Sequence, residues 1–131
     1  MSFPAEKKYL KITLCLNKLD HLTNEEFSEY WRTTHADLAL SNKTFTDRCR
    51  RYNQHHATPE TKEIARSFGN PTLDFDGIAE VWVDDLEAWK EISADQDFLE
   101  KILPDEKKFI QHPITVMLGY DYTVVGEKAP R

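Results

Sequence analysis

The sequence predicts an α+β domain in which four antiparallel strands form one sheet and helices cover one face of that sheet. Three observations lead to this expectation. Residues 9–18 alternate between apolar and polar side chains, Thr23 opens an amphipathic helix, and the elements follow the order strand, helix, strand, strand, helix, strand. That order is the split βαβ arrangement of ferredoxin-like domains.

The first strand and the first helix carry the clearest signals. From Tyr9 to Lys18, every second residue is apolar, which is typical of a strand with one buried face. Thr23 is a good N-cap for the following helix, and Glu26 completes a capping box with it. We expect this helix to continue to Ser41–Asn42.

The remaining elements follow from hydrophobic periodicity and from proline and glycine positions. They are a strand from Arg48 to His56, a short helix from Thr58 to about Phe68, a strand from Phe75 to Val83, a helix that Asp84 and Asp85 cap, a helical piece from Asp95, a short helical turn from Pro104 to Ile110, and a strand from Ile114 to Val125.

Composition excludes several classes of protein. The formal net charge of −6 argues against a nucleic-acid-binding protein, and no apolar run approaches the ~20 residues that span a bilayer. Residues Met1–Lys8 precede no signal-peptide core, and Cys15 and Cys49 belong to no metal or redox motif. We therefore expect one cytoplasmic domain, residues 1–131, with free thiols, no cofactor and no bound metal.

The third strand indicates a homodimer. Both of its faces are substantially apolar, with Ile78 and Trp82 on one side and Ala79, Val81 and Val83 on the other. Helices cover only one face of the sheet, so a monomer exposes the other apolar face to water. Pairing two sheets face to face buries it.

His35 is the first candidate for catalysis. On a 3.6-residue wheel, Phe27, Trp31, Thr34 and Leu38 form one helix face, and His35 lies at its edge. Histidine titrates near neutral pH, so a ring between a core and a cavity suits acid/base chemistry. The alternative is a histidine at the edge of the core that bonds to a backbone carbonyl.

Further candidates lie on the second and third strands. Tyr52, Gln54 and His56 share a face that could line a pocket with His35, or could be a strand end covered by a loop. Asp76 and Glu80 share a parity, and either one could orient a histidine, hold substrate or form an ion pair.

Two tryptophans and one acidic turn complete the candidates. Trp31 and Trp82 could pack in the core or form the wall of a slot for a flat aromatic ligand. The segment Asp105–Lys108 is expected to be a solvated helical turn.

Four segments resemble the EthD family of dimeric α/β-barrel proteins: Phe27–Ala36, Tyr52–His56, Phe75–Trp82 and Asp105–Ile110. They cover nearly the whole chain in the family's order. Within that family, the chain resembles the small fungal decarboxylases of aromatic polyketide pathways, those similar to atrochrysone carboxylic acid decarboxylase. The resemblance implies a dimeric α/β barrel that removes CO2 from an aromatic polyketide acid without a metal, flavin or nucleotide.

The resemblance and the residues together suggest a set of roles. His35 is the acid/base group, while His56 and Tyr52 polarise substrate oxygens. Substrate-binding candidates are Trp31, Gln54, Asp76, Glu80 and Trp82. A polyketide cyclase or dehydratase with the same pocket remains an alternative, as does a non-catalytic barrel that binds a small ligand.

Overall fold

The computed structural model describes residues 8–127, so residues 1–7 and 128–131 of the expected domain lie outside the described part. Its four strands form one antiparallel sheet in the order β2-β3-β1-β4. This topology confirms the ferredoxin-like prediction. The strands are β1 (Leu10–Leu16), β2 (Cys49–His56), β3 (Gly77–Val83) and β4 (Thr115–Tyr120).

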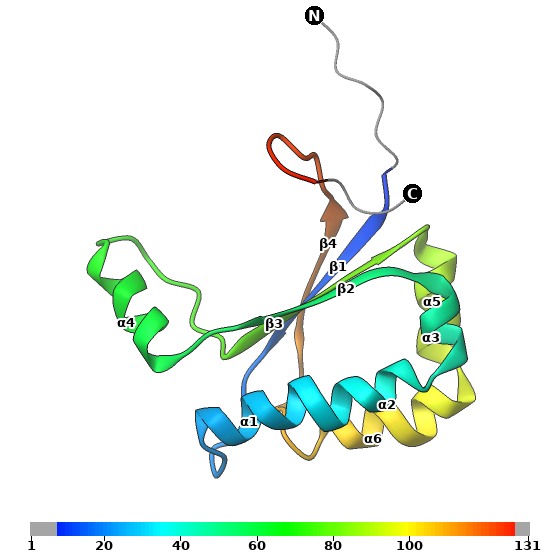
Figure 1. The fold of residues 1–131 in the computed structure, drawn as a ribbon, viewed down its shortest axis with the longest axis horizontal. Helices are drawn as coiled ribbons and strands as arrows, with labels where there is room; N and C mark the ends of the chain where they lie inside the picture. Colours follow the sequence, from blue (N-terminus) through cyan, green and yellow to red (C-terminus); the bar gives the residue numbers. More distant parts are fainter. Residues whose placement is uncertain (1–7, 128–131) are drawn as a thin grey trace, which may run out of the picture.

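Most helices pack beneath one face of the sheet, and α4 stands apart beyond the ends of β2 and β3 (Figure 1). Two of the helical segments, η1 and η2, are π-helical. In chain order the helices are α1 (Asn24–Tyr30), η1 (Trp31–His35), α2 (Ala36–Leu40), α3 (Lys43–Arg48), α4 (Pro59–Ser67), α5 (Leu86–Ala94), η2 (Phe98–Ile102) and α6 (Leu103–Glu106).

The expected helix starts are confirmed by their caps. The Thr23 hydroxyl accepts a hydrogen bond from the Glu26 amide, and the Glu26 carboxylate accepts one from the Thr23 amide. Thr58 caps α4 with Pro59 in its first turn, and Asp85 caps α5. Each cap satisfies amides that a helix start leaves without an intrahelical partner.

Three element predictions need correction. The last strand is shorter than the predicted Ile114–Val125, because pairing with β1 ends at Tyr120. Helix α3 was not predicted; Asn42 caps it by accepting a hydrogen bond from the Phe45 amide. The first long helix is interrupted by the π-helical segment η1.

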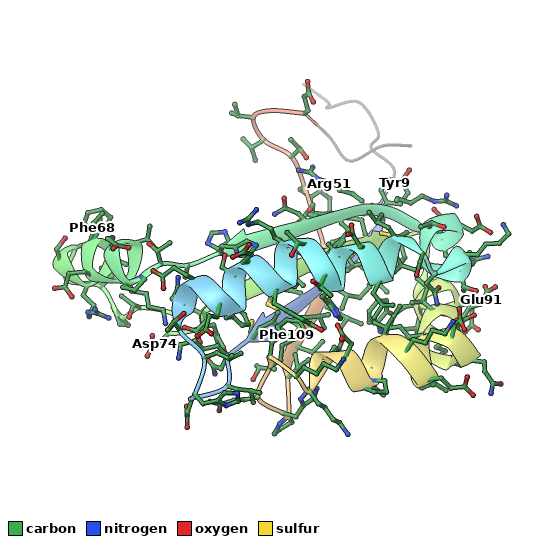
Figure 2. All side chains as sticks on the ribbon, turned by 60° about the horizontal axis from the view of Figure 1, so that its bottom comes forward. Tyr9, Arg51, Phe68, Asp74, Glu91 and Phe109 are labelled. Atoms are coloured by element: carbon green, nitrogen blue, oxygen red, sulfur yellow. The ribbon has the colours of Figure 1, made fainter. Side chains whose placement is uncertain are left out.

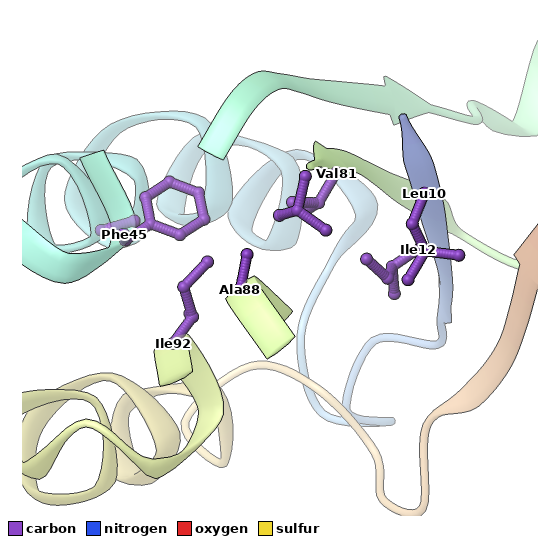
Figure 3. Packing of buried hydrophobic residues seen from close by; sticks show 8 residues of the cluster. Leu10, Ile12, Phe45, Val81, Ala88 and Ile92 are labelled. Atoms are coloured by element: carbon purple, nitrogen blue, oxygen red, sulfur yellow. The ribbon is translucent and has the colours of Figure 1, made fainter. Parts of the chain in front are cut away.

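The core fills the space between the sheet and the helices. Leu10 and Ile12 of β1 and Val81 of β3 meet side chains of α3 and α5, as Figure 3 shows. A second buried cluster includes Trp31 and Phe109, on the side of the sheet where α1 and η1 pack. Of these two residues, Phe109 is labelled near the middle of Figure 2. These two clusters enclose the candidate site.

The uncovered face of β3 differs from the expectation. Trp82 is only 5% exposed, because the Lys11 and Arg51 side chains lie over its ring and its indole N–H donates to Asp121. On the same face, Glu80 forms an ion pair with Lys11 at 2.7 Å. The prediction that a monomer exposes Trp82 to water on this face, which was part of the argument for a dimer, is therefore wrong.

Exposed apolar side chains gather instead on the edge strand β4. Val116 is 50% exposed and Met117 is 72% exposed, and Leu118 and Tyr120 are also exposed. Because the sheet alternates its faces, these residues expose apolar surface on both sides of β4.

Two smaller expectations also have outcomes. Cys15 and Cys49 are free thiols, as predicted. Within residues 8–127, none of the helices combines the length and the apolar character that crossing a bilayer requires.

Candidate functional site

A cavity of about 240 Å³ lies between the sheet and the helical layer. Its walls are almost entirely apolar, and they come from all four strands on one side and from η1, α2, α3, α5, η2 and α6 on the other. Half-exposed Val116 is part of the lining, so the cavity reaches the surface beside β4. Apart from tryptophan, the polar residues of the lining are His35, Tyr52 and Glu106.

The π-helical segment η1 turns His35 into this cavity. Thr34, placed on the buried face by a regular helical wheel, is exposed, and Leu38 is only half-buried. The buried residues are Trp31, His35 and Ala39, at a spacing of four. A π-helical turn holds an extra residue, so each later side chain moves one position along the helix face. His35 is therefore inside the buried stripe and not at its edge.

Asp105 is the buried partner of His35. The two residues are 6% and 5% exposed, and Nδ1 of His35 lies 2.9 Å from Oδ2 of Asp105. The other carboxylate oxygen, Oδ1, accepts a 2.6 Å hydrogen bond from the Tyr30 hydroxyl and forms an ion pair with Lys108 at 3.3 Å. Because a carboxylate accepts and does not donate, Nδ1 carries the proton and Nε2 has the free lone pair.

Burial and hydrogen bonding set the charges of this group. Burial lowers the pKa of His35, and the hydrogen bond and charge of Asp105 oppose that effect only in part. For Asp105, burial acts to raise the pKa, but the donors Tyr30, His35 and Lys108 outweigh it and lower the pKa. Burial beside Asp105 raises the pKa of Tyr30 to about 12. The resting arrangement is a neutral imidazole held by a carboxylate, which is the form of a general base.

Glu106 is a second carboxyl group of the cavity. Its side chain is 14% exposed, and Oε2 lies 3.6 Å from Nε2 of His112. Burial raises the pKa of Glu106, and the charge of neighbouring Asp105 adds to that effect against the opposing influence of His112.

The row Tyr52, Gln54 and His56 faces the helical layer, as expected, but the structure brings only Tyr52 into the cavity lining. The Gln54 amide donates to the Tyr52 hydroxyl at 2.9 Å and to the Trp31 carbonyl at 3.1 Å. Because the Tyr52 oxygen accepts this bond, its own proton is available to a ligand.

His56 holds the Gln54 side chain of this row by a hydrogen bond. Its Nε2–H donates to the Gln54 side-chain oxygen at 2.9 Å, and Nδ1 accepts from the Ser28 hydroxyl at 2.6 Å. Its ring also packs 4.5 Å from the Trp31 ring, centroid to centroid. Burial lowers the pKa of His56, and the nearby Arg32 and His55 charges add to this. Both ring nitrogens are occupied, so His56 fixes Gln54 and does not reach the cavity.

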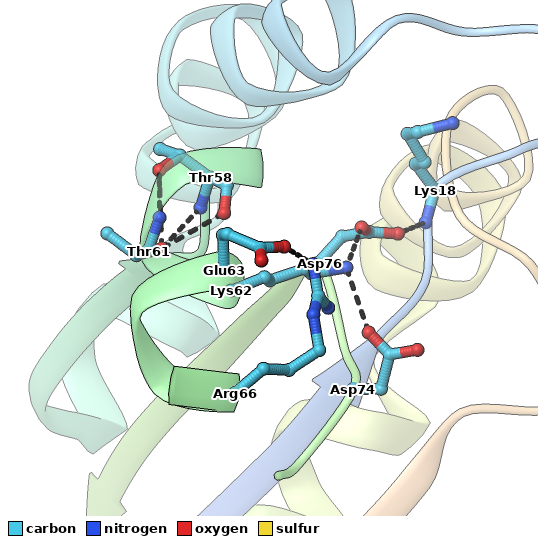
Figure 4. A network of polar contacts seen from close by, with 8 residues as sticks. All are labelled: Lys18, Thr58, Thr61, Lys62, Glu63, Arg66, Asp74 and Asp76. Carbon is cyan, nitrogen blue, oxygen red and sulfur yellow. Dashed lines mark hydrogen bonds and ion pairs between the residues drawn. The ribbon is translucent and has the colours of Figure 1, made fainter. Parts of the chain in front are cut away.

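The structure does not bring Asp76, Glu80 or Trp82 to the cavity. Asp76 joins α4 to the end of β1 by accepting from Lys62 and from the Lys18 amide, both at 2.8 Å (Figure 4). Glu80 and Trp82 project from the opposite face of the sheet. Of the tryptophans proposed for binding, Trp31 alone lines the cavity.

Asp105 and Glu106 correct the expectation of a solvated turn. Lys107 and Lys108 of that turn are exposed, but both carboxyl groups are turned inward. The sequence held a signal for this. Ile102, Asp105, Glu106, Phe109 and Ile110 follow the spacing of a buried helix face, i, i+3, i+4, i+7 and i+8. Acidic residues at two of those positions indicate buried, partnered carboxyl groups.

No cluster of three or more His, Cys, Asp or Glu side chains in the described range is arranged to hold a metal ion. The chemistry that the cavity residues offer is proton transfer by His35 and Glu106 and hydrogen bonding by Tyr52.

Among known protein families, the EthD domain matches residues 19–113 of this chain. No curated protein matches the chain. A solved EthD (ethyl tert-butyl ether D) family protein from Bacillus halodurans is similar, with 18% identity over 87% of this chain and 99% of that chain and a TM-score of 0.59.

Two further solved structures have the same fold. A DABB family protein with a ferredoxin-like fold from Mesorhizobium loti is 8% identical, covers 91% of this chain and 99% of its own, and has a TM-score of 0.59. A dimeric protein with a ferredoxin-like fold from Bacteroides fragilis is 9% identical, covers 88% and 98%, and has the same score. At these identities the likeness establishes the fold and not the chemistry.

Proposed function

The chain belongs to the EthD domain family, and from that premise we propose that it is a cofactor-free lyase that removes CO2 from an aromatic polyketide carboxylic acid in secondary metabolism. The observation that carries the proposal is the His35–Asp105 pair at the wall of an apolar cavity. A buried, neutral histidine with one free nitrogen is suited to moving a proton at a carbon atom.

The reaction follows from the protonation state of His35. When the substrate binds as the neutral acid, Nε2 takes the proton of its carboxyl group, and the bond between CO2 and the ring carbon breaks. The electron pair moves into the conjugated ring and its oxygen, and the Tyr52 hydroxyl donates a hydrogen bond to that developing oxyanion. The imidazolium, held by Asp105, then returns its proton to the carbon. The sum is an acid converted to CO2 and the hydrogen-substituted ring.

The cavity suits a compact, flat and mostly apolar ligand. Drug-sized ligand sites occupy about 300–1,000 Å³, so a cavity of about 240 Å³ lies just below that range. The Trp31 and Phe98 side chains in its walls provide the aromatic surface that a flat ring packs against.

One observation favours a second reaction. No lysine or arginine belongs to the cavity lining within residues 8–127, so a substrate carboxylate has no fixed cation to pair with. A cyclase or dehydratase acts on an uncharged ketone and needs no such cation. In that reaction, Nε2 of His35 removes a proton next to the ketone, and a hydroxyl group leaves or a ring closes.

The test is incubation of the purified protein with an anthraquinone-type polyketide acid, followed by mass spectrometry. We expect a loss of the mass of CO2, and we expect turnover to survive exhaustive chelation. Loss of water identifies the dehydratase. Tight binding without turnover overturns both reactions and leaves a ligand-binding barrel.

A matched pair of histidine variants localises the chemistry. His35→Gln should reduce turnover by about 10²–10⁴-fold, the usual contribution of a positioned acid/base group. His55→Gln is the control, because His55 is exposed on the opposite face of the same sheet. Equal losses in both variants would argue against His35.

We also propose that the protein acts as a homodimer that forms a two-sheet barrel, and that it works in the cytoplasm. The exposed apolar strand β4 supports the first, as does the description of the Bacteroides fragilis neighbour as dimeric. The free thiols Cys15 and Cys49 support a reducing compartment.

A further inference from the structure

Glu106 faces the cavity, and it also meets a group that reaches solvent. It lines the cavity from α6, and His112, whose side chain is 31% exposed, lies on the segment that follows. The 3.6 Å between Oε2 and Nε2 allows proton transfer through a small side-chain movement or one water molecule. No other carboxyl group belongs to the cavity lining among the described residues.

The tautomer of His112 defines how many protons this pair holds. Nδ1 of His112 lies 3.2 Å from the Ile110 carbonyl, which can only accept, so Nδ1 carries a proton. In the neutral ring, Nε2 then has a lone pair that faces the Glu106 carboxyl. The pair shares one exchangeable proton, on the carboxyl or on Nε2.

We infer that Glu106 is a second proton-exchanging group of the cavity, and that His112 connects its carboxyl to solvent. This inference rests on the proposed function and specifies how that reaction obtains its proton. A carboxylic acid ionises with a pKa of about 4, so most of the substrate at neutral pH binds as a carboxylate and brings no proton. Neutral His35 carries its proton on Nδ1, toward Asp105, and has none on Nε2 to give to such a substrate. Its decarboxylation consumes one proton from water in each turnover, which His35 alone does not supply.

Glu106 provides that proton and also tolerates the charge of the substrate. In its neutral form it donates a hydrogen bond to the anionic substrate, whereas an ionised Glu106 would repel it. When the bond to CO2 breaks, the electron pair remains on the ring. The ring carbon takes the proton of the Glu106 carboxyl group, and the resulting Glu106 carboxylate regains a proton from water through His112.

The surroundings of Glu106 favour this neutral form. Burial raises its pKa, Asp105 on the same helix raises it further, and His112 opposes them. Tyr52 on β2 and His35 on η1 line the same cavity, and Glu106 raises the pKa of Tyr52 in turn, after the larger effect of burial.

A titration tests the pairing without any substrate. Carbon-13 NMR of the side-chain carboxyl should show Glu106 titrating above the ordinary glutamate value of 4.5, and His112→Gln should raise its pKa further because an opposing group is lost. An ordinary titration, or one that His112→Gln leaves unchanged, overturns the inference. The titration can support the Glu106–His112 pairing even if the protein decarboxylates no acid. A lack of decarboxylation would reject the proposed reaction and not the pairing.

Kinetics test the role. With an ionised substrate, Glu106→Gln should lower kcat by about 10²–10⁴-fold, and His112→Gln should lower it less, with recovery on adding imidazole to the buffer. Glu100→Gln makes the same chemical change on the exposed side of η2 and should leave kcat unchanged. Full activity of Glu106→Gln overturns the inference.

Discussion

The Trp31 ring occupies the space in which a side chain at Gly77 would stand. A Cβ at position 77 would lie 2.5 Å from Cζ3 of Trp31 and 3.0 Å from Cη2. Trp31 is buried against β3 by Phe27 and His56, so its ring has no room to retreat. Because Gly77 has no side chain, Trp31 can pack against the start of β3 and form part of the cavity wall.

Gly77→Ala should therefore destabilise the protein. Overpacking a well-filled core costs about 1–3 kcal/mol, measured here as the free energy of unfolding in urea. Gly119→Ala is the control, since no atom lies within 4 Å of a Cβ at that position of β4. In a Trp31→Phe background the cost of Gly77→Ala should shrink. Equal effects of the two alanines would show that the Trp31 contact is not responsible.

Asp105→Asn tests whether Asp105 supports His35 as the proposed acid/base group. The change keeps the shape of the side chain but removes the charge that raises the pKa of His35, so that pKa should fall further below its ordinary value. It also removes the preference for a proton on Nδ1. We expect kcat to fall by about 10²–10⁴-fold, with the pKa of His35 followed by NMR.

Lys108→Met provides the comparison for Asp105→Asn. Lys108 meets the same carboxylate from an exposed position, and surface ion pairs contribute little. Its kcat should change by no more than a few-fold. If both variants retain full activity, the carboxylate does not support the chemistry.

The sheet and the helix caps could be predicted from the sequence because local patterns determine them. The alternation in β1 and the capping box at Thr23 depend on neighbouring residues, and both are present in the structure. The position of His35 could not be predicted from a regular wheel. The π-helical turn brings the ring against Phe109, 74 positions away in the chain, with ring centroids 4.9 Å apart, and the helix pattern alone does not reveal that partner.

The partners of the candidate residues were harder to predict than the residues themselves. His35 was identified from its own helix, but Asp105 lies 70 positions further on and meets it only in the fold. Asp76 and Glu80 were considered as partners because strand parity was the available guide. Parity does not show which lysine lies nearby, and Lys62 and Lys11 take these two carboxylates.

Stability should depend on pH through His35. Its pKa in the folded protein lies below the ordinary value of 6.5, so the unfolded chain binds the proton first as the pH falls. The contribution is complete above pH 6.5 and is lost as the pH decreases towards the folded pKa. One such group contributes a slope of at most about 1.4 kcal/mol per pH unit.

His35→Gln should flatten that slope between pH 6.5 and 5.5 in urea unfolding experiments. Some slope should remain, since burial also lowers the pKa of His56 and gives the same sign. Glu106 acts in the opposite direction, because a raised carboxyl pKa makes stability fall as the pH rises above 4.5. An unchanged slope in His35→Gln would show that the ring is not held neutral by burial.

Met117→Lys should dissociate the proposed dimer. Met117 is 72% exposed in the middle of edge strand β4, and an exposed apolar edge is the kind of surface that associates. An obligate interface of this type should bury upwards of ~2,000 Å², and a lysine at its centre must lose its hydration. Light scattering at micromolar concentration should show a dimer for the wild type and a monomer for the variant.

Leu99→Lys, at an exposed leucine on η2, should remain dimeric. Val116 next to Met117 lines the cavity, so dissociation should also weaken substrate binding and raise KM. A wild-type protein that is a stable, folded monomer under these conditions would refute the dimer.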